Sequence, residues 1–185
     1  MARKPRINQA GLTYHVWAHG IDDTPLFGDA VAKEVALRLL REEVALSSWS
    51  CLEYVLMSTH YHLVLTLKKA TLSTGIQRLN MRFAQWFNKH HGRRGHVFET
   101  RFGCRIVDGD DDQLEAMRYV ALNPTRAGIC RRPEQYPWAG YASTIGLYAP
   151  DPLVDVKAAL RPVRGSADAY RAFVEERDPR ARRGP

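Results

Sequence analysis

An apolar run that contains two histidines constrains the fold more than any other feature of this chain. Residues 54–67 read YVLMSTHYHLVLTL, and their Val, Leu and Thr content favours strands over a helix. A tight turn at Ser58 and Thr59 predicts two strands, over 51–57 and 60–67. Side chains alternate between the two faces of a strand, so His60 and His62 point to the same face. Such a pair can share one divalent cation or cap a strand edge without metal, and the spacing leaves both interpretations open.

Hydrophobic periodicity predicts further elements on both sides of this hairpin. They are two more strands and two helices: strands over 11–19 and 97–107, and helices over 29–44 and 72–90. The resulting order is typical of the α+β class, with a ferredoxin-like β-α-β-β-α-β antiparallel sheet covered on one face by two helices. Another helix is added C-terminally over 113–122, after a run of aspartates that suits its positive end.

The length of 185 residues predicts one main domain over 1–145 and a C-terminal helical extension over 146–185, which ends in a basic, disordered tail. No apolar run approaches the roughly 18 residues that span a bilayer, and no secretory signal is recognisable. Cys51, Cys104 and Cys130 form no CxxC pair, so neither a disulfide framework nor a zinc ribbon is expected. We therefore expect a cytoplasmic protein with no membrane partner.

Positive charge is concentrated in one part of the chain. The net charge is +7, and residues 68–105 hold nine basic residues against a single acidic one, a net +8. A localised basic band is the electrostatic footprint of a polyanion-binding protein. An anionic membrane surface could also attract such a band, but nucleic acid is the favoured partner.

A tyrosine and an asparagine lie four residues apart at the end of the third predicted helix, so Tyr119 and Asn123 share one helical face. If this helix crosses the open face of the sheet, both side chains meet the strand histidines. Two imidazoles and an amide oxygen can bind a divalent ion that polarises a phosphodiester, with the phenol as nucleophile. The alternative is a core tyrosine and a helix-capping asparagine, which Pro124 directly after Asn123 favours.

Four segments of the chain resemble one family of enzymes. They are residues 54–65 (YVLMSTHYHLVL), 92–102 (GRRGHVFETRF), 118–128 (RYVALNPTRAG) and 133–141 (PEQYPWAGY). Together they resemble the single-tyrosine HUH transposases of the IS200-like fold, and in particular the REP-associated tyrosine transposases. The resemblance runs in register over most of the chain.

The resemblance implies a metal-dependent single-stranded DNA endonuclease and strand transferase that acts beside hairpins or palindromes. Tyr119 matches the family's nucleophile, which forms a 5′-phosphotyrosine and frees a 3′-hydroxyl. His60, His62 and Asn123 match its metal ligands, and the added helix is then the catalytic one. The metal is expected to be Mg²⁺ or Mn²⁺, although histidine ligands alone would also suit zinc. Such an enzyme works as a monomer or a homodimer, and is nucleoid-associated when bound to DNA.

The same resemblance gives the basic band a role in holding DNA phosphates or a hairpin. The residues expected to bind DNA are Arg82, Lys89, Arg93, Arg94, His96, Arg101 and Arg126. Two departures from the family pattern concern DNA recognition. The family reads Met-Pro-Asn-His where residues 57–60 are MSTH, and its first strand ends Arg-Gly-Asn where residues 18–21 are AHGI. His19 is a candidate replacement contact.

Two other functions fit the same residues. One is a domesticated relative that grips hairpin DNA through residues 68–105 without cutting it. The other is a metal-dependent RNA or nucleotide hydrolase without a covalent step, which would tolerate Tyr119→Phe. A protein–oligonucleotide adduct that survives denaturant distinguishes the transposase from both.

Overall fold

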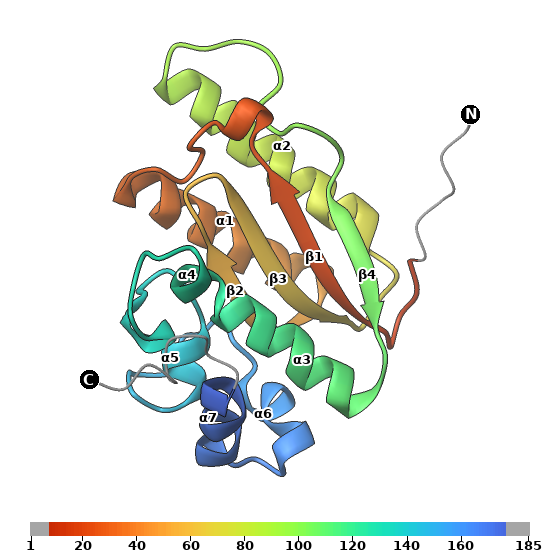
Figure 1. The fold of residues 1–185 in the computed structure, drawn as a ribbon. Helices are drawn as coiled ribbons and strands as arrows, with labels where there is room; N and C mark the ends of the chain where they lie inside the picture. The colour runs from red at the N-terminus through yellow and green to blue at the C-terminus, as the bar shows by residue number, and fades with distance from the viewer. Residues whose placement is uncertain (1–7, 177–185) are drawn as a thin grey trace.

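The computed structural model describes residues 8–176, in which a four-stranded antiparallel sheet lies between two layers of helices (Figure 1). The strands are β1 (Thr13–His19), β2 (Trp49–Leu56), β3 (His60–Leu67) and β4 (Gly103–Val107). Their order across the sheet is β2-β3-β1-β4, and every neighbouring pair is antiparallel. The predicted ferredoxin-like α+β fold is confirmed.

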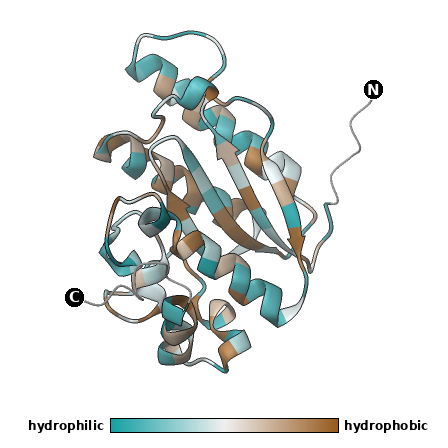
Figure 2. Cartoon of the chain, in the orientation of Figure 1, coloured by the Kyte–Doolittle hydropathy of each residue, from teal (hydrophilic) through white to brown (hydrophobic). Residues whose placement is uncertain are grey.

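Two long helices, α1 (Ala30–Ser47) and α2 (Leu72–His90), cover one face of the sheet and lie behind it in Figure 1. Asp29 caps α1 by accepting the Ala32 N–H at 2.7 Å. Each helix carries both hydrophobic and hydrophilic residues (Figure 2), and its apolar side packs on the inward side chains of the strands.

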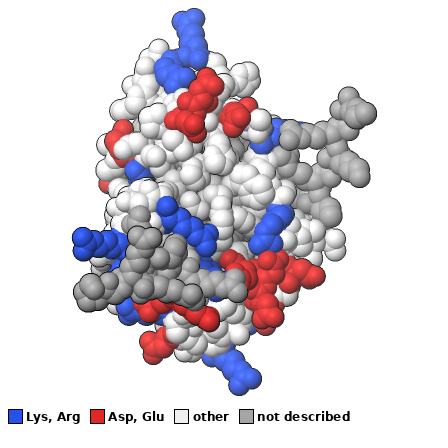
Figure 3. Space-filling model, in the orientation of Figure 1, with Lys and Arg blue, Asp and Glu red and all other residues white. Residues whose placement is uncertain are grey.

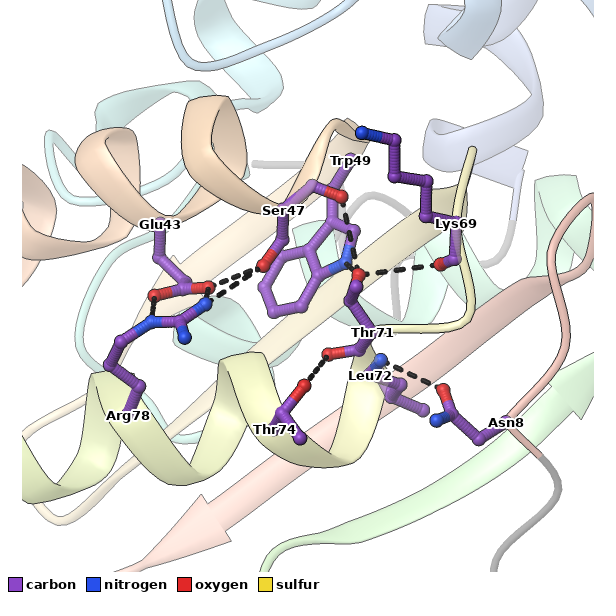
Figure 4. Close-up of polar contacts among 9 residues, drawn as sticks. All are labelled: Asn8, Glu43, Ser47, Trp49, Lys69, Thr71, Leu72, Thr74 and Arg78. Carbon is purple, nitrogen blue, oxygen red and sulfur yellow. Dashed lines mark hydrogen bonds and ion pairs between the residues drawn. The ribbon is translucent and has the colours of Figure 1, made fainter.

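An ion pair between a buried glutamate and a partly exposed arginine ties these two helices together (Figure 4). Glu43 on α1 is fully buried, and Arg78 on α2 donates to both of its carboxylate oxygens, at 2.8 Å and 2.7 Å. Next to it, the indole N–H of Trp49 donates to the Thr71 hydroxyl at 2.9 Å. A buried carboxylate needs such a partner. Arg78 was counted in the basic band, but its charge is neutralised by Glu43 and does not add to the positive charge available to a ligand.

The opposite face of the sheet is covered by α3 (Gly109–Ala121), which lies in front of it in Figure 1. The sequence predicted a helix over 113–122, but α3 begins four residues earlier. The aspartates after Gly109 form its first turn, where negative charge is favourable, and Asp112 accepts the Asp108 N–H at 3.0 Å. Asn123 is also not in this helix. It begins the short helix α4 (Asn123–Arg126).

The fourth strand is shorter than the predicted 97–107. Residues 97–102 leave the ladder and follow the end of β1, where the short helix η1 (Ile21–Asp23) begins. Val97 and Phe102 are buried, whereas residues 99–101 are exposed. The apolar side chains that suggested a strand therefore reach the core from an irregular segment.

The C-terminal part packs against α3 and the outer edge of the sheet. It contains η2 (Pro133–Gln135), α5 (Tyr141–Thr144), α6 (Val156–Ala159), η3 (Arg161–Val163) and α7 (Ala167–Glu176). The guanidinium of Arg118 on α3 lies 4.1 Å over the Phe173 ring on α7. The basic tail predicted to be disordered, over 177–185, falls outside the described residues. No helix within 8–176 has the length and apolarity needed to cross a bilayer.

Candidate active site

Histidines gather on the sheet face that α3 partly covers. On β1, His15, Trp17 and His19 alternate with residues of the α1–α2 core and so point to the α3 face. His60 and His62 on β3 point the same way, as their spacing predicts. The antiparallel register pairs His19 with His60 and Trp17 with His62. The sheet therefore brings four histidines together, of which the sequence analysis assigned His60 and His62 to a metal and named His19 as a candidate DNA contact.

His15 and His62 are joined by a hydrogen bond of 3.0 Å between His15 Nε2 and His62 Nδ1. Burial, followed by the nearby positive charge of Arg105, lowers the pKa of His15 to about 4, against an opposite effect of Asp112. Burial also lowers the pKa of His62 to about 2, and the neighbouring histidines add to the effect. Both rings are neutral at neutral pH, so one donates the hydrogen that the other accepts.

His60 is half-buried at the start of β3. Its ring stacks on that of His19, with centroids 4.6 Å apart, and its Nδ1 lies 3.1 Å from the Thr59 hydroxyl. Burial and His19 lower the pKa of His60, and a side-chain hydrogen bond with Asn123 raises it. The turn between α3 and α4 therefore brings the Asn123 amide to the histidine pair.

Tyr119 faces the histidines from α3. The centroid of its ring lies 5.4 Å from that of His62 and 5.5 Å from that of His15. Its side chain is 43% exposed, which excludes the alternative of a core tyrosine. The guanidinium of Arg126, from α4, lies 5.3 Å over the ring. Phenol, imidazoles and one cation thus converge from four elements, β1, β3, α3 and α4.

These side chains line an open cavity of about 520 Å³. Its walls are formed by His15, Trp17, His19, His60, His62, Arg105, Glu115, Arg118, Tyr119 and Arg126. Arg105 pairs with Asp112 at 2.7 Å, and Arg118 pairs with Glu115. Arg126 has no carboxylate partner in the described part of the chain, so its charge is free to meet an anion.

The other residues expected to bind DNA lie in the second half of α2 and in the segment after it. They are Arg82, Lys89, Arg93, Arg94, His96 and Arg101. Segment 91–102 is tied to the end of β1, because Ile21 N–H donates to Val97 O and Glu99 N–H donates to His19 O, both at 3.0 Å. It therefore borders the His19 end of the cavity. Arg82 also pairs with Glu42 at 2.6 Å.

On the face shown in Figure 3, the surface over the strands is largely uncharged, and Lys and Arg side chains lie on either side of it. Acidic side chains gather over the first turn of α3. A second acidic group lies near the upper end of this view, so positive charge on this face is confined to a few side chains beside the strands.

The predicted metal ligands are two histidines and an asparagine. Nδ1 of His60 is engaged by Thr59 and Nδ1 of His62 by His15, so an ion would bind through Nε2 of each ring, and the Asn123 amide already contacts His60 through a side-chain hydrogen bond. The two ring centroids lie 5.2 Å apart, close to the separation of two imidazoles bound to one ion at about 2.1 Å. Within 8–176 no three His, Cys, Asp or Glu side chains form a metal-binding group, so an amide oxygen has to complete the set. The donor chemistry fits.

Sequence reasoning missed His15 and Trp17 as members of this site. Their signal was present, because residues 15, 17 and 19 alternate on one strand exactly as His60 and His62 do. The sequence does not give the register between β1 and β3, and it is this register that places the β1 side chains beside His60 and His62.

The fold and the site define an α+β protein with a histidine–tyrosine cavity on a ferredoxin-like sheet. The chain belongs to the IS200-like transposase family, whose model matches residues 8–123. This membership supports a transposase role and, with it, a DNA-cleaving enzyme.

A solved structure agrees with this fold. A REP-associated tyrosine transposase bound to a REP hairpin superposes with a TM-score of 0.67 at 17% identity, over 84% of this chain and 93% of that one. A protein assigned as a transposase from Deinococcus radiodurans R1 matches with a TM-score of 0.45 at 16% identity, over 69% of this chain and 92% of that one. None of the curated proteins compared with the chain matches it.

Proposed function

We propose that this protein is a metal-dependent endonuclease and strand transferase for single-stranded DNA, with Tyr119 as nucleophile. The observation that carries the proposal is the exposed phenol of Tyr119 facing His62, with ring centroids 5.4 Å apart, at an open cavity. The cavity thus offers a nucleophile, two imidazoles and an arginine without a carboxylate partner in the described part of the chain, all of which phosphoryl transfer can use.

The reaction is a transesterification that needs no external energy source. The Tyr119 oxygen forms a bond to phosphorus and loses its proton, while the bond from phosphorus to the 3′-oxygen breaks and that oxygen takes up a proton. The products are a 5′-phosphotyrosine and a free 3′-hydroxyl. Because one phosphodiester replaces another, the same site can rejoin strands in the reverse direction.

His60, His62 and Asn123 would hold the divalent ion, for which Mg²⁺ or Mn²⁺ is proposed. Such an ion supplies charge neutralisation and polarisation at the scissile phosphate. Arg126 would hold a non-bridging phosphate oxygen beside Tyr119, since its guanidinium already lies over that ring. Thr59 and His15 orient the two imidazoles through their Nδ1 atoms.

Hairpin DNA is the proposed substrate. Support comes from the similar structure, which is a REP-associated tyrosine transposase bound to a REP hairpin. The exposed basic residues at the end of α2 and in segment 91–102 would contact backbone phosphates of the stem, and the single strand would pass His19 into the cavity. The chain supplies Tyr119 and both histidines itself, which suits a tyrosine acting in cis.

The test is covalent capture. A labelled hairpin oligonucleotide with single-stranded flanks is incubated with the protein and Mg²⁺ or Mn²⁺, and adducts that survive denaturant are scored on a gel. We expect an adduct with the native protein and none with Tyr119→Phe. Tyr148→Phe is the matched control, because Tyr148 is an exposed tyrosine that does not line the cavity, and it should react normally.

Each alternative predicts a different result. A hairpin-binding module would shift the oligonucleotide in a native gel without any adduct. A hydrolase without a covalent step would cut the strand, form no adduct and tolerate Tyr119→Phe. Loss of the adduct in His60→Ala or His62→Ala, with DNA binding retained, would support the metal site.

A further inference from the structure

Trp17 differs in its setting from the other tryptophans. All four lie within the described residues, and Trp49, Trp86 and Trp138 belong to a hydrophobic core cluster or pack against one. Trp17 is part of neither cluster, although it sits on a central strand of the sheet. A large indole left out of the core at a cavity wall is a candidate for ligand contact.

One face of the Trp17 indole packs against the backbone of Gly103, which is paired with Trp17 on the neighbouring strand β4. A Cβ added to Gly103 would fall 2.2 Å from Trp17 Cε2, and 2.4 Å and 2.6 Å from Nε1 and Cζ2. An approach within the ring plane, between Nε1 and Cζ2, would bring the Cβ closer to these two atoms than to Cε2, so that Cβ would lie above the ring plane. Only a glycine at position 103 lets the indole take this position. One ring face is therefore covered by backbone, and Trp17 borders the cavity with the rest of its half-buried side chain.

The other rings at the cavity are already in contact on at least one side. His19 and His60 stack on each other, and Arg126 lies over Tyr119. Trp17 lies 5.3 Å from His15 and 6.5 Å from His62, measured between centroids. It is the largest aromatic ring that lines the cavity, and it shares the neighbour His15 with the proposed nucleophile Tyr119, whose ring centroid lies 5.5 Å from that of His15.

We propose that Trp17 forms a stacking subsite for one unpaired nucleobase of the strand held beside Tyr119. The inference rests on the proposed function, because it assumes that single-stranded DNA enters this cavity. Bases of every kind stack on an indole, since each has a π face. Arg126, which lines the same cavity without a carboxylate partner in the described part of the chain, suits this division, with the base on the ring and its phosphate at the cation.

The test separates stacking from phosphate binding. Affinities are measured by fluorescence anisotropy in the full chain carrying Tyr119→Phe. The probes are an oligothymidine of about 20 nucleotides and an abasic oligonucleotide of equal length and charge. Trp17→Leu keeps apolar bulk without an aromatic face, and Trp17→Phe keeps an aromatic face. Tyr148→Leu is the control at an exposed aromatic residue away from the cavity.

We expect Trp17→Leu to weaken binding of oligothymidine about tenfold and to leave binding of the abasic probe unchanged. Trp17→Phe should retain most of the affinity, and the control should match the parent protein. Equal losses on both probes, or no loss on either, would overturn the subsite. Thermal unfolding of each variant verifies that the fold is intact.

Adduct formation by the protein with Tyr119 intact is scored separately. If the adduct forms but Trp17→Leu does not selectively weaken oligothymidine binding, the stacking subsite is wrong and the proposed function stands. If Trp17→Leu selectively weakens oligothymidine binding but no adduct forms, the subsite is supported and the proposed cleavage is wrong.

Discussion

His15 Nε2 lies 3.0 Å from His62 Nδ1, so the hydrogen between them determines which nitrogen of His62 can bind an ion. If His62 donates from Nδ1, its Nε2 carries a lone pair and can coordinate. If His15 donates, Nε2 of His62 carries the hydrogen and cannot. Coordination through Nε2 therefore requires His15 as acceptor. In metal sites the acceptor of this hydrogen bond is usually a carboxylate, a carbonyl or a water. Here a neutral histidine, His15, would be the acceptor.

If His15 must accept the hydrogen from His62, two substitutions of His15 should have different effects. Glutamine keeps an acceptor oxygen, whereas leucine keeps only bulk. We expect His15→Leu to weaken Mn²⁺ binding about 10- to 100-fold and His15→Gln to retain most of it. Calorimetric titration of the DNA-free protein measures both, with His90→Leu as the control at an exposed histidine on α2. Equal affinities in the leucine and glutamine variants would show that His15 does not set the tautomer.

The same histidine pair makes the ion-free fold sensitive to acid. The pKa of His15 is about 4 in the fold against an ordinary value of 6.5, so between these pH values the unfolded chain binds more protons. Stability is therefore greatest above pH 6.5 and falls as the pH drops toward 4. We expect His15 alone to cost about 2 kcal/mol between pH 7 and pH 5.

Urea unfolding in EDTA at these two pH values measures the effect. His15→Gln removes the titrating ring, so its loss of stability between pH 7 and pH 5 should be smaller than that of the native protein by about this amount. An unchanged difference between the two pH values would contradict the burial of a neutral His15.

Most of the fold was predictable because each element has its own hydrophobic period. β3 and α2 have the predicted bounds, over 60–67 and 72–90, because periodicity and turn residues agree there. The errors at β4 and α3 arose where local signals conflicted. Apolar side chains in 97–102 reach the core without strand pairing, and the aspartates before Gln113 are helical residues and not a preceding cap.

The candidate site was predictable only in part. Spacing placed the two histidines on one strand face and Tyr119 and Asn123 four residues apart, and the family resemblance supplied their expected roles, although Tyr119 lies in α3 and Asn123 in α4. His15 and Trp17 become site residues only through the pairing of β1 with β3 and β4, which the sequence of β1 alone does not specify. The pairing of Arg78 with Glu43 is also tertiary, which is why charge counting overstated the free positive charge of α2.

Arg126 should contribute one phosphate contact. It lines the cavity without a carboxylate partner in the described part of the chain, whereas Arg105 and Arg118 are paired there. We expect Arg126→Ala to weaken single-stranded DNA binding several-fold and to reduce the slope of log affinity against log salt by about 1. Arg38→Ala is the control, because Arg38 is exposed on α1 and pairs with Glu42. An unaltered salt slope in Arg126→Ala would exclude a phosphate contact.

Glu53 should make the packing of the C-terminal part weaken as the pH rises. Burial raises the pKa of this β2 carboxyl to about 8, against the downward effect of its hydrogen bonds with the Tyr54 N–H and the Tyr170 hydroxyl. Between the ordinary pKa of 4.5 and this value, the fold binds more protons than the unfolded chain, so stability falls as the pH rises through that range. We expect the stability of Glu53→Gln, which stays neutral, to rise relative to that of the native protein by about 3–4 kcal/mol between pH 5 and pH 8. Urea unfolding at both pH values measures the difference, and Glu34→Gln, at an exposed position on α1, should show none. A constant stability difference across the two pH values would mean that Glu53 is not held protonated in the fold.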